Sequence, residues 1–268
     1  MSLSLAQNST EKTTGNDYGF TLVELVIVML VVCIIMAGVS GVYQAQTRAS
    51  AQNENIADIQ QNLRGAVAVM TTEIRQAGCD PTKNADAGIV SATATRLQFT
   101  ADLAGNPVNP NDADGIISQG TVIPPGVNEN ITYGFGAGID VNNNGIVDNG
   151  GADWSMSASL GRTTITGGAM QPFADNIEAI EFNYILMDGT VTNGSGIPSP
   201  AQTNTSISNP NDIRTVQISI LGRSNNPSQN YRNTETYTTA SGLVWNPPDD
   251  AFRRRLVIVN IYCRNMGW

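Results

Sequence analysis

The sequence contains no histidine and only three cysteines. Without histidine, the chain cannot build Ser-His-Asp or Cys-His nucleophilic sets, and it cannot hold zinc or haem through imidazole. Three cysteines also fall short of the four thiolates that an all-cysteine zinc or iron–sulfur site needs. Because these absences remove the commonest catalytic and cofactor sites, we expect that the protein is not an enzyme.

Charge is also scarce, at 14% of the 268 residues, against ~25% in an ordinary soluble protein. The 14 Lys and Arg residues are outnumbered by 23 Asp and Glu, which leaves a net charge of −9. Recognition of a phosphate backbone depends on clustered basic residues, so we predict no nucleic-acid partner. Hydrophobic residues reach 41%, enough for a sizeable core.

One long hydrophobic run stands near the start of the chain. The polar residues 1–19 are followed by Phe20–Val42, which contains a single charge, Glu24. A helix over this run would reach ~35 Å, enough to cross ~30 Å of hydrocarbon. A carboxylate in such a span costs a few kcal/mol, ~2.5–3.5 for Asp, so Glu24 should have a specific partner. A simple membrane anchor, or a secretory signal cleaved near Ser40, would give Glu24 no such partner.

The residues that begin this run carry a family resemblance. The heptapeptide GFTLVEL, Gly19–Leu25, resembles the processing motif of type IV prepilins and of the related pseudopilins. The resemblance implies that residues 1–19 are a leader and that prepilin peptidase cleaves between Gly19 and Phe20. It also implies N-methylation of Phe20 and pairing of Glu24 with the N-terminal amine of a neighbouring subunit during assembly.

Beyond Tyr43 the apolar pattern continues on one helical face only. Spacings of three and four residues join Ile56, Ile59, Leu63, Val67, Met70 and Ile74. Gly78 and Pro81 mark the end of the pattern. We therefore predict one helix from Phe20 to about Ala77, with residues 20–42 in the membrane and the amphipathic residues 43–78 against a head formed by residues 79–268.

The head reads as short strands separated by Gly-, Asn- and Pro-rich loops. The fold class that we predict is α+β, with the long helix packed on an antiparallel sheet. The run Leu256–Tyr262 is almost continuously apolar, so we place it at the centre of the sheet, and Asn193–Asp212 should be an exposed loop. The predicted strands are Arg96–Thr100, Asn130–Phe135, Trp154–Arg162, Ile177–Met187, Arg214–Ser224, Thr234–Thr239 and Arg255–Tyr262.

Several blocks of the head, in order, resemble the PilW-like minor pilins. The resemblance implies a pilin-like fold and a minor subunit of a type IV pilus that initiates or caps the fibre. It also implies major and minor pilins and the inner-membrane assembly machinery as partners, with the head in the periplasm before assembly and on the cell surface afterwards. A minor pseudopilin of type II secretion and a secreted calcium-binding adhesin are the alternatives. The blocks are Ile74–Gly78, Leu97–Asp102, Asn128–Tyr133, Leu160–Arg162, Gln171–Tyr184, Ile213–Ile220 and Phe252–Leu256.

One loop has the oxygen-ligand spacing of a calcium site. The ligands would be four side chains and one backbone carbonyl around a sharp turn at Gly145. Gly151 stands where the usual bidentate Glu would be, and Asp153 could replace it only along a different backbone path. The other interpretation is an Asn-Gly turn in which Asx side chains cap their own backbone. The candidate Ca²⁺ ligands are Asp140, Asn142, Asn144, Ile146 and Asp148.

The cysteines and an arginine run leave two further questions. Cys33 lies in the apolar helix, where it is a small hydrophobe. Cys79 and Cys263 could form a disulfide if the head folds in an oxidising compartment, or both could be buried free thiols. The run Arg253–Arg255 is either a solvated entrance to the last strand or a site for an acidic partner.

Overall fold

The computed structural model describes residues 19–104, 113–118, 128–148, 150–194 and 207–266. The chain divides into two compact units, Met1–Ser50 and Ala51–Trp268. A single helix, α1 (Leu22–Ile74), supplies residues to both units, and each unit is described here by itself. The predicted helix is confirmed, although it ends at Ile74 rather than near Ala77.

In the first unit, α1 is apolar on every side from Leu22 to Val42, apart from Glu24, and mostly polar residues follow from Gln44 to Ser50. All described residues up to Ser50 are exposed, including the large aliphatic side chains of Leu25, Ile34 and Val39. By length and composition, this is the helix of the described chain that can cross a membrane. A helix that is hydrophobic all round has to find an apolar environment outside itself.

In the second unit, α1 is amphipathic. Five of its residues are buried against the sheet, namely Ile59, Leu63, Ala66, Met70 and Ile74. Val67 of the predicted stripe is half-buried, and Ala66 takes a place on the buried face that sequence spacing had not assigned. After Ile74 the chain turns through Gly78, whose φ of 75° favours glycine.

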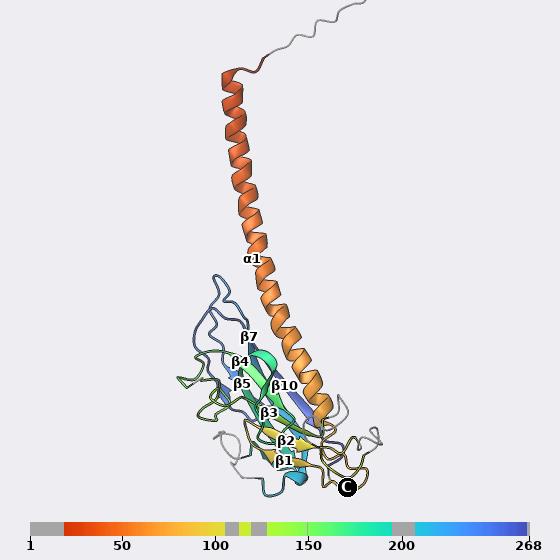
Figure 1. Cartoon of the computed structure of the whole chain (residues 1–268). Helices are drawn as coiled ribbons and strands as arrows, with labels where there is room; N and C mark the ends of the chain where they lie inside the picture. The colour runs from red at the N-terminus through yellow and green to blue at the C-terminus, as the bar shows by residue number, and fades with distance from the viewer. Residues whose placement is uncertain (1–18, 105–112, 119–127, 149, 195–206, 267–268) are drawn as a thin grey trace, which may run out of the picture. The chain divides into compact units, whose positions relative to one another are not determined.

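The head is built on one antiparallel sheet with the order β1-β2-β3-β4-β5-β7-β10, and β6 pairs with β5 (Figure 1). β8 and β9 form a separate hairpin among the described residues. The strands are β1 (Ile89–Ala92), β2 (Leu97–Thr100), β3 (Asn130–Gly134), β4 (Ala158–Thr163), β5 (Gln171–Leu186), β6 (Val191–Thr192), β7 (Ile213–Arg223), β8 (Tyr237–Thr238), β9 (Val244–Trp245) and β10 (Arg254–Tyr262), with a 3-10 turn at Pro210–Asp212. The predicted α+β fold is therefore confirmed.

The two faces of the sheet are covered differently. On one face, alternate residues of β5 and β7 such as Phe182 and Ile218 join the stripe of α1 in the main core. On the other face, Ala179 and Leu221 pack against the β8–β9 hairpin, with Trp245 fully buried between them and solvent. Side chains alternate between the faces because the strand period is two.

Four predicted strands, those matching β2, β3, β7 and β10, lie within one residue of their predicted bounds. β5 begins six residues earlier than predicted, because its first residues pair with β4 despite their polarity. β4 begins later than predicted, since Trp154 has a φ of 66° and cannot lie in a strand. The short strands β1, β6 and β9 carry too few residues for a periodic signal.

The position predicted for the last strand is wrong. Among the described strands, β10 lies at an edge of the sheet and pairs with β7 alone. Its apolar run is only partly buried: the half-buried Val257 and Val259 pack on the main core and the half-buried Leu256 contacts the second cluster, whereas Ile258 and Tyr262 are exposed. Partial cover on two faces does not require neighbours along both edges. The predicted loop Asn193–Asp212 lies partly outside the described residues, and Asn193 itself is buried.

Candidate functional site

The predicted cleavage site lies just before α1. Phe20 is 89% exposed, and a Cβ placed on Gly19 would meet nothing within 4 Å. Within the described residues, therefore, no side chain covers the bond at which cleavage is predicted.

Thr21 and Glu24 close the first turn of α1 with reciprocal hydrogen bonds. The backbone N–H and the hydroxyl of Thr21 donate to Glu24 Oε2 at 2.9 and 3.0 Å, and the Glu24 N–H donates to the Thr21 hydroxyl at 3.3 Å. This capping box satisfies N–H groups that have no acceptor inside the helix. In the described part of the chain, Glu24 Oε1 accepts no hydrogen bond, so one carboxylate oxygen is engaged and the other is open.

Thr21 is a helix-capping residue to which the prepilin resemblance had given no role. Its signal is nevertheless present in the sequence, because Thr21 is followed three residues later by Glu24 ahead of an apolar run. That spacing predicts a capping box wherever a helix begins. Two roles therefore meet on the Glu24 carboxylate: it caps its own helix, and it presents a free oxygen.

The candidate calcium loop is closed by its own backbone. Asp140 accepts the N–H groups of Asn144 and Gly145 at 3.0 and 2.9 Å. Asp148 accepts the N–H groups of Val141 and Gly150 at 3.2 and 3.0 Å. These bonds fold the loop into a succession of Asx turns, which is the second of the two interpretations that the sequence left open.

The amide side chains of the loop follow the same pattern. The oxygens of Asn142 and Asn144 accept the next N–H groups but one, from Asn144 and Ile146, at 3.1 and 2.8 Å. Their nitrogens donate to Asp153, at 2.9 and 2.7 Å, so Asp153 does reach the loop. Gly145 has a φ of 81°, and a Cβ there would lie 2.3 Å from the Ile180 carbonyl oxygen, so only glycine fits.

The pKa values of the two loop carboxylates, Asp140 and Asp148, are shifted in opposite directions. Burial raises the pKa of Asp140, whereas hydrogen bonds led by the Gly150 N–H lower the pKa of Asp148. Ile146 is held to the sheet through an antiparallel bridge to Ala179. Among the described residues, no group of three or more Asp, Glu, Cys or His side chains is placed to hold a metal ion. Calcium binding by this loop therefore stays a prediction.

Cys33, Cys79 and Cys263 are all unbonded in this structure. Burial raises the pKa of Cys79, and raises that of Cys263 to about 12, so burial disfavours the thiolate form of both residues. Cys263 is buried and Cys79 is half-buried, and the disulfide between them, one of the two alternatives that the sequence left open, stays a prediction.

The three residues of the run Arg253–Arg255 differ in burial. The side chain of Arg254 is fully buried and forms ion pairs with Glu178 and Asp250. Arg253 lies over the ring of Tyr231, 4.2 Å from its centroid, and Arg255 is exposed. A solvated strand entrance is therefore the wrong description of Arg254, which is a structural cation of the head.

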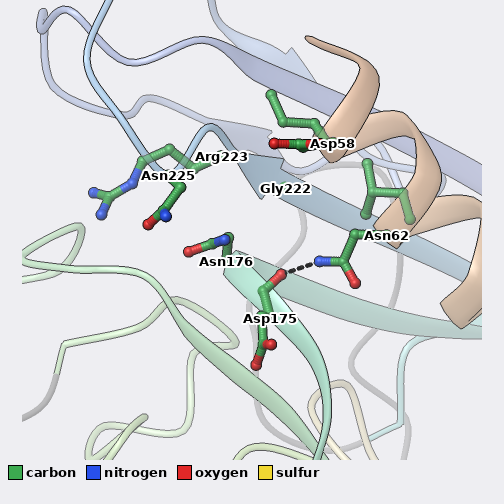
Figure 2. Close-up of a pocket in the computed structure, with 9 residues that line it drawn as sticks. Asp58, Asn62, Asp175, Asn176, Gly222, Arg223 and Asn225 are labelled. Atoms are coloured by element: carbon green, nitrogen blue, oxygen red, sulfur yellow. Dashed lines mark hydrogen bonds between the residues drawn. The ribbon is translucent and has the colours of Figure 1, made fainter. Parts of the chain in front are cut away.

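A small polar pocket lies where α1 first meets the sheet. Figure 2 shows Asp58 and Asn62 of the helix facing Asp175 and Asn176 of β5, with Arg223 of β7 on the far side. The Asn62 side-chain amide donates to the Asp175 carbonyl oxygen, which anchors the helix to the strand. Sequence reasoning did not predict this pocket, since its residues come from three elements that only the fold brings together.

Two family models match the chain. The model described as Type IV Pilus-assembly protein W matches residues 139–265, and the prokaryotic N-terminal methylation motif matches residues 15–40. The second match covers the predicted cleavage site and the apolar start of α1. The chain is similar to type IV pilins, and its residues 139–265 match a PilW domain. The predicted resemblance to type IV prepilins and PilW-like pilins is thereby confirmed.

This pilin-like protein is also similar to a solved structure, a type IV-like pilin from Thermus thermophilus. The similarity has 13% identity and a TM-score of 0.43, and it covers 78% of this chain and 97% of the other. A search of curated proteins gave no significant match. The processing and assembly roles of Gly19, Phe20 and Glu24 stay predictions.

Proposed function

We propose that this protein is a minor pilin of a type IV pilus, cleaved by prepilin peptidase between Gly19 and Phe20 and N-methylated at Phe20. Before assembly, the apolar part of α1 anchors the chain in the inner membrane with its head in the periplasm. During assembly, the chain joins other pilins and initiates or caps the fibre. The match of residues 15–40 to the methylation motif supports the processing step.

The observation that carries the assembly step is the half-engaged carboxylate of Glu24. Thr21 donates twice to Oε2, which leaves Oε1 with open lone pairs. Cleavage after Gly19 would create an ammonium group on Phe20 of each mature subunit. A neighbour's ammonium can therefore bind Oε1 while Thr21 keeps the helix capped, and a charge-assisted bond of this kind is strong in hydrocarbon.

Variants at these positions separate the charge of Glu24 from its capping role. Glu24→Gln keeps an oxygen that can accept from Thr21 but removes the negative charge, and Glu24→Val removes both. Thr21→Val removes the hydroxyl that donates to Glu24 Oε2 and accepts the Glu24 N–H, but it keeps the Glu24 charge and the backbone N–H bond to Oε2. We expect both Glu24 variants to reduce the subunit in sheared fibres by about tenfold or more, and Thr21→Val to reduce it less.

Mass spectrometry of the same fibres tests the processing step. The expected N-terminal peptide begins with N-methyl-Phe20, and the subunit should be far less abundant than the major pilin. Normal incorporation of Glu24→Gln would refute the pairing mechanism. A mature chain that keeps residues 1–19, or begins beyond Val42, would refute the pilin assignment itself.

A further inference from the structure

The outer edge of β10 has the properties of a strand-pairing surface. β10 pairs with β7 over nine consecutive residues, from Arg254 opposite Arg223 to Tyr262 opposite Thr215, without a bulge. It is the last strand of the sheet order among the described strands. One side of a long, regular strand therefore faces outward.

The register shows which backbone groups lie on that side. The Cys263 N–H donates to the Arg214 carbonyl oxygen at 2.9 Å, so Cys263 belongs to a hydrogen-bonded pair. In an antiparallel ladder such pairs alternate, so the N–H and C=O groups of Val257, Val259 and Ile261 also point to β7. The outward groups are those of Leu256, Ile258, Asn260 and Tyr262, and no described residue forms a hydrogen bond with them.

The opposite edge of the sheet is protected in a way that β10 is not. β1 has four residues, and its register is interrupted between Ile89 and Ser91. Short, bulged edges resist pairing with another chain, as do edges that carry charges or proline. Between Leu256 and Tyr262 there is neither a charged residue nor a proline. The sequence of β10 therefore preserves its ability to pair.

Side chains beside the outward backbone groups are exposed and apolar. Ile258 is 45% exposed and Tyr262 is 59% exposed, and both lie on the face of the sheet that carries the β8–β9 hairpin. These two side chains are available for contact with a further strand at this edge.

A row of amide side chains runs to the same edge. Asn183 of β5 donates to Gln217 of β7 at 2.6 Å, and Gln217 donates to Asn260 of β10 at 3.0 Å. The amide nitrogen of each residue donates to the amide oxygen on the next strand toward the edge, and the Asn260 nitrogen is the last donor of the row. A further strand with an acceptor side chain opposite Asn260 would continue it.

We propose that the outer edge of β10 binds an extended segment of a neighbouring pilin subunit as an added antiparallel strand. The segment carries apolar side chains opposite Ile258 and Tyr262, an Asn, Gln or Ser-type acceptor opposite Asn260, and an acidic residue beside the exposed Arg255. The segment's backbone gives affinity, and these side chains give specificity. The identity of the occupant as a pilin rests on the proposed function; the pairing chemistry does not.

A labelled peptide tests the pairing directly on the full chain in detergent micelles. The probe VTNVITVEE places Val, Asn and Ile opposite Tyr262, Asn260 and Ile258 and a Glu opposite Arg255. Its control has the same sequence with N-methyl groups on the alternate residues that would pair, which removes their donors without changing charge. We expect saturable binding of the probe, and binding weaker by about tenfold or more for the methylated control.

Two substitutions of one residue give the matched test on the protein. Ile258→Pro removes an outward N–H and leaves the ladder with β7 intact, whereas Ile258→Val keeps the N–H and the β-branched shape. The proline variant should bind about tenfold more weakly and the valine variant equally well. Near-ultraviolet circular dichroism shows whether each variant is folded, and if Ile258→Pro is not, the methylated peptide decides alone.

Three outcomes would overturn the inference. They are no saturable binding, equal binding of the methylated and unmethylated peptides, and equal binding of the peptide by a folded Ile258→Pro variant. Self-association of the chain that disappears in the folded proline variant would assign the edge to a second copy, and would also overturn it. Peptide binding requires no fibre, so its failure is distinguishable from a failure to find N-methyl-Phe20 in fibres.

Discussion

The two parts of α1 show how one helix can serve two environments. In the part that belongs to the first unit, large aliphatic residues such as Leu30 and Ile34 lie on all sides and are exposed. In the part that belongs to the second unit, a stripe from Ile59 to Ile74 is buried, and residues such as Arg64 are exposed. The helix is continuous, but its apolar pattern changes from all-round to one-sided.

The difference separates assembly from folding. The large apolar side chains of the first part are exposed and need lipid or other helices, so their substitution should act on membrane insertion and packing. Side chains of the second part complete the core of the head, which has no other helix on that face among the described elements. We therefore expect substitutions in the second part of α1 to lower the stability of the head, and substitutions in the first part to leave it unchanged.

The largest expected effect on stability comes from the buried stripe. Leu63→Ala should destabilise the head by about 2–5 kcal/mol, because Leu63 is 1% exposed and packs on the backbone of Gly222, so its removal leaves a cavity. The matched substitution in the first part is Leu30→Ala, at a residue 59% exposed, which should leave the head unchanged. Thermal unfolding followed by near-ultraviolet circular dichroism reports on the head, since Trp154 and Trp245 both belong to it.

Equal loss of melting temperature in the two variants would break the division. It would mean that the first part of α1 contributes to the stability of the head as much as the second part does.

A smaller effect is expected where the end of α1 is held to the sheet by charge. Arg162 of β4 donates from Nη2 and Nε to Glu73 at 2.7 and 3.0 Å, and the Tyr133 hydroxyl also donates to Glu73. Glu73→Ala leaves both donors without an acceptor in a mostly buried site and should cost about 1–3 kcal/mol. Arg64→Ala, at an exposed position on the same helix, is the control.

A double-mutant cycle isolates the pair. The free-energy losses of Glu73→Ala and Arg162→Ala should not be additive. Additive losses would mean that the two side chains do not stabilise the head through each other, which would refute a stabilising Glu73–Arg162 ion pair.

The stripe, the helix and most long strands were predictable because each depends on a local period. The edge position of β10 was not, since Leu256–Tyr262 has the same pattern at an edge as at the centre. Burial of Arg254 was equally hidden, because its partner Glu178 lies 76 residues away and reaches it only through the pairing of β5, β7 and β10. In the candidate site, the cap of Glu24 by Thr21 was readable from spacing, whereas the polar pocket in Figure 2 required three elements to meet.

The buried carboxyl group of Glu181 predicts a modest dependence of the head's stability on pH. Glu181 is fully buried under the β8–β9 hairpin, accepts from Ser241 at 2.5 Å, and has no partner for its other oxygen in the described structure. Burial raises the pKa of Glu181, so the neutral form is favoured in the folded state. The contribution of Glu181 to the free energy of unfolding is therefore greatest below the pKa that it has in the unfolded chain. That contribution is lost as the pH rises through the higher pKa that it has in the folded protein.

Glu181→Gln removes this titration while keeping the shape and the acceptor for Ser241. The difference in unfolding free energy between wild type and variant should change by at most about 1.4 kcal/mol per pH unit, with the wild type losing stability at higher pH. Parallel pH profiles of the two proteins from about pH 4 to 8 would refute a buried, titrating Glu181.

The smallest effect is expected at the loop from Asp140 to Asp153. Its carboxylates accept backbone or side-chain N–H groups, and a bound cation would have to compete with these groups. EGTA should therefore shift the melting temperature by less than about 1 °C, because a ligand stabilises the native state only in proportion to ln(1 + [L]/Kd). A rise of several degrees with added Ca²⁺, absent in Asp148→Asn, would instead show that the ion displaces these N–H groups and that the loop is a calcium site.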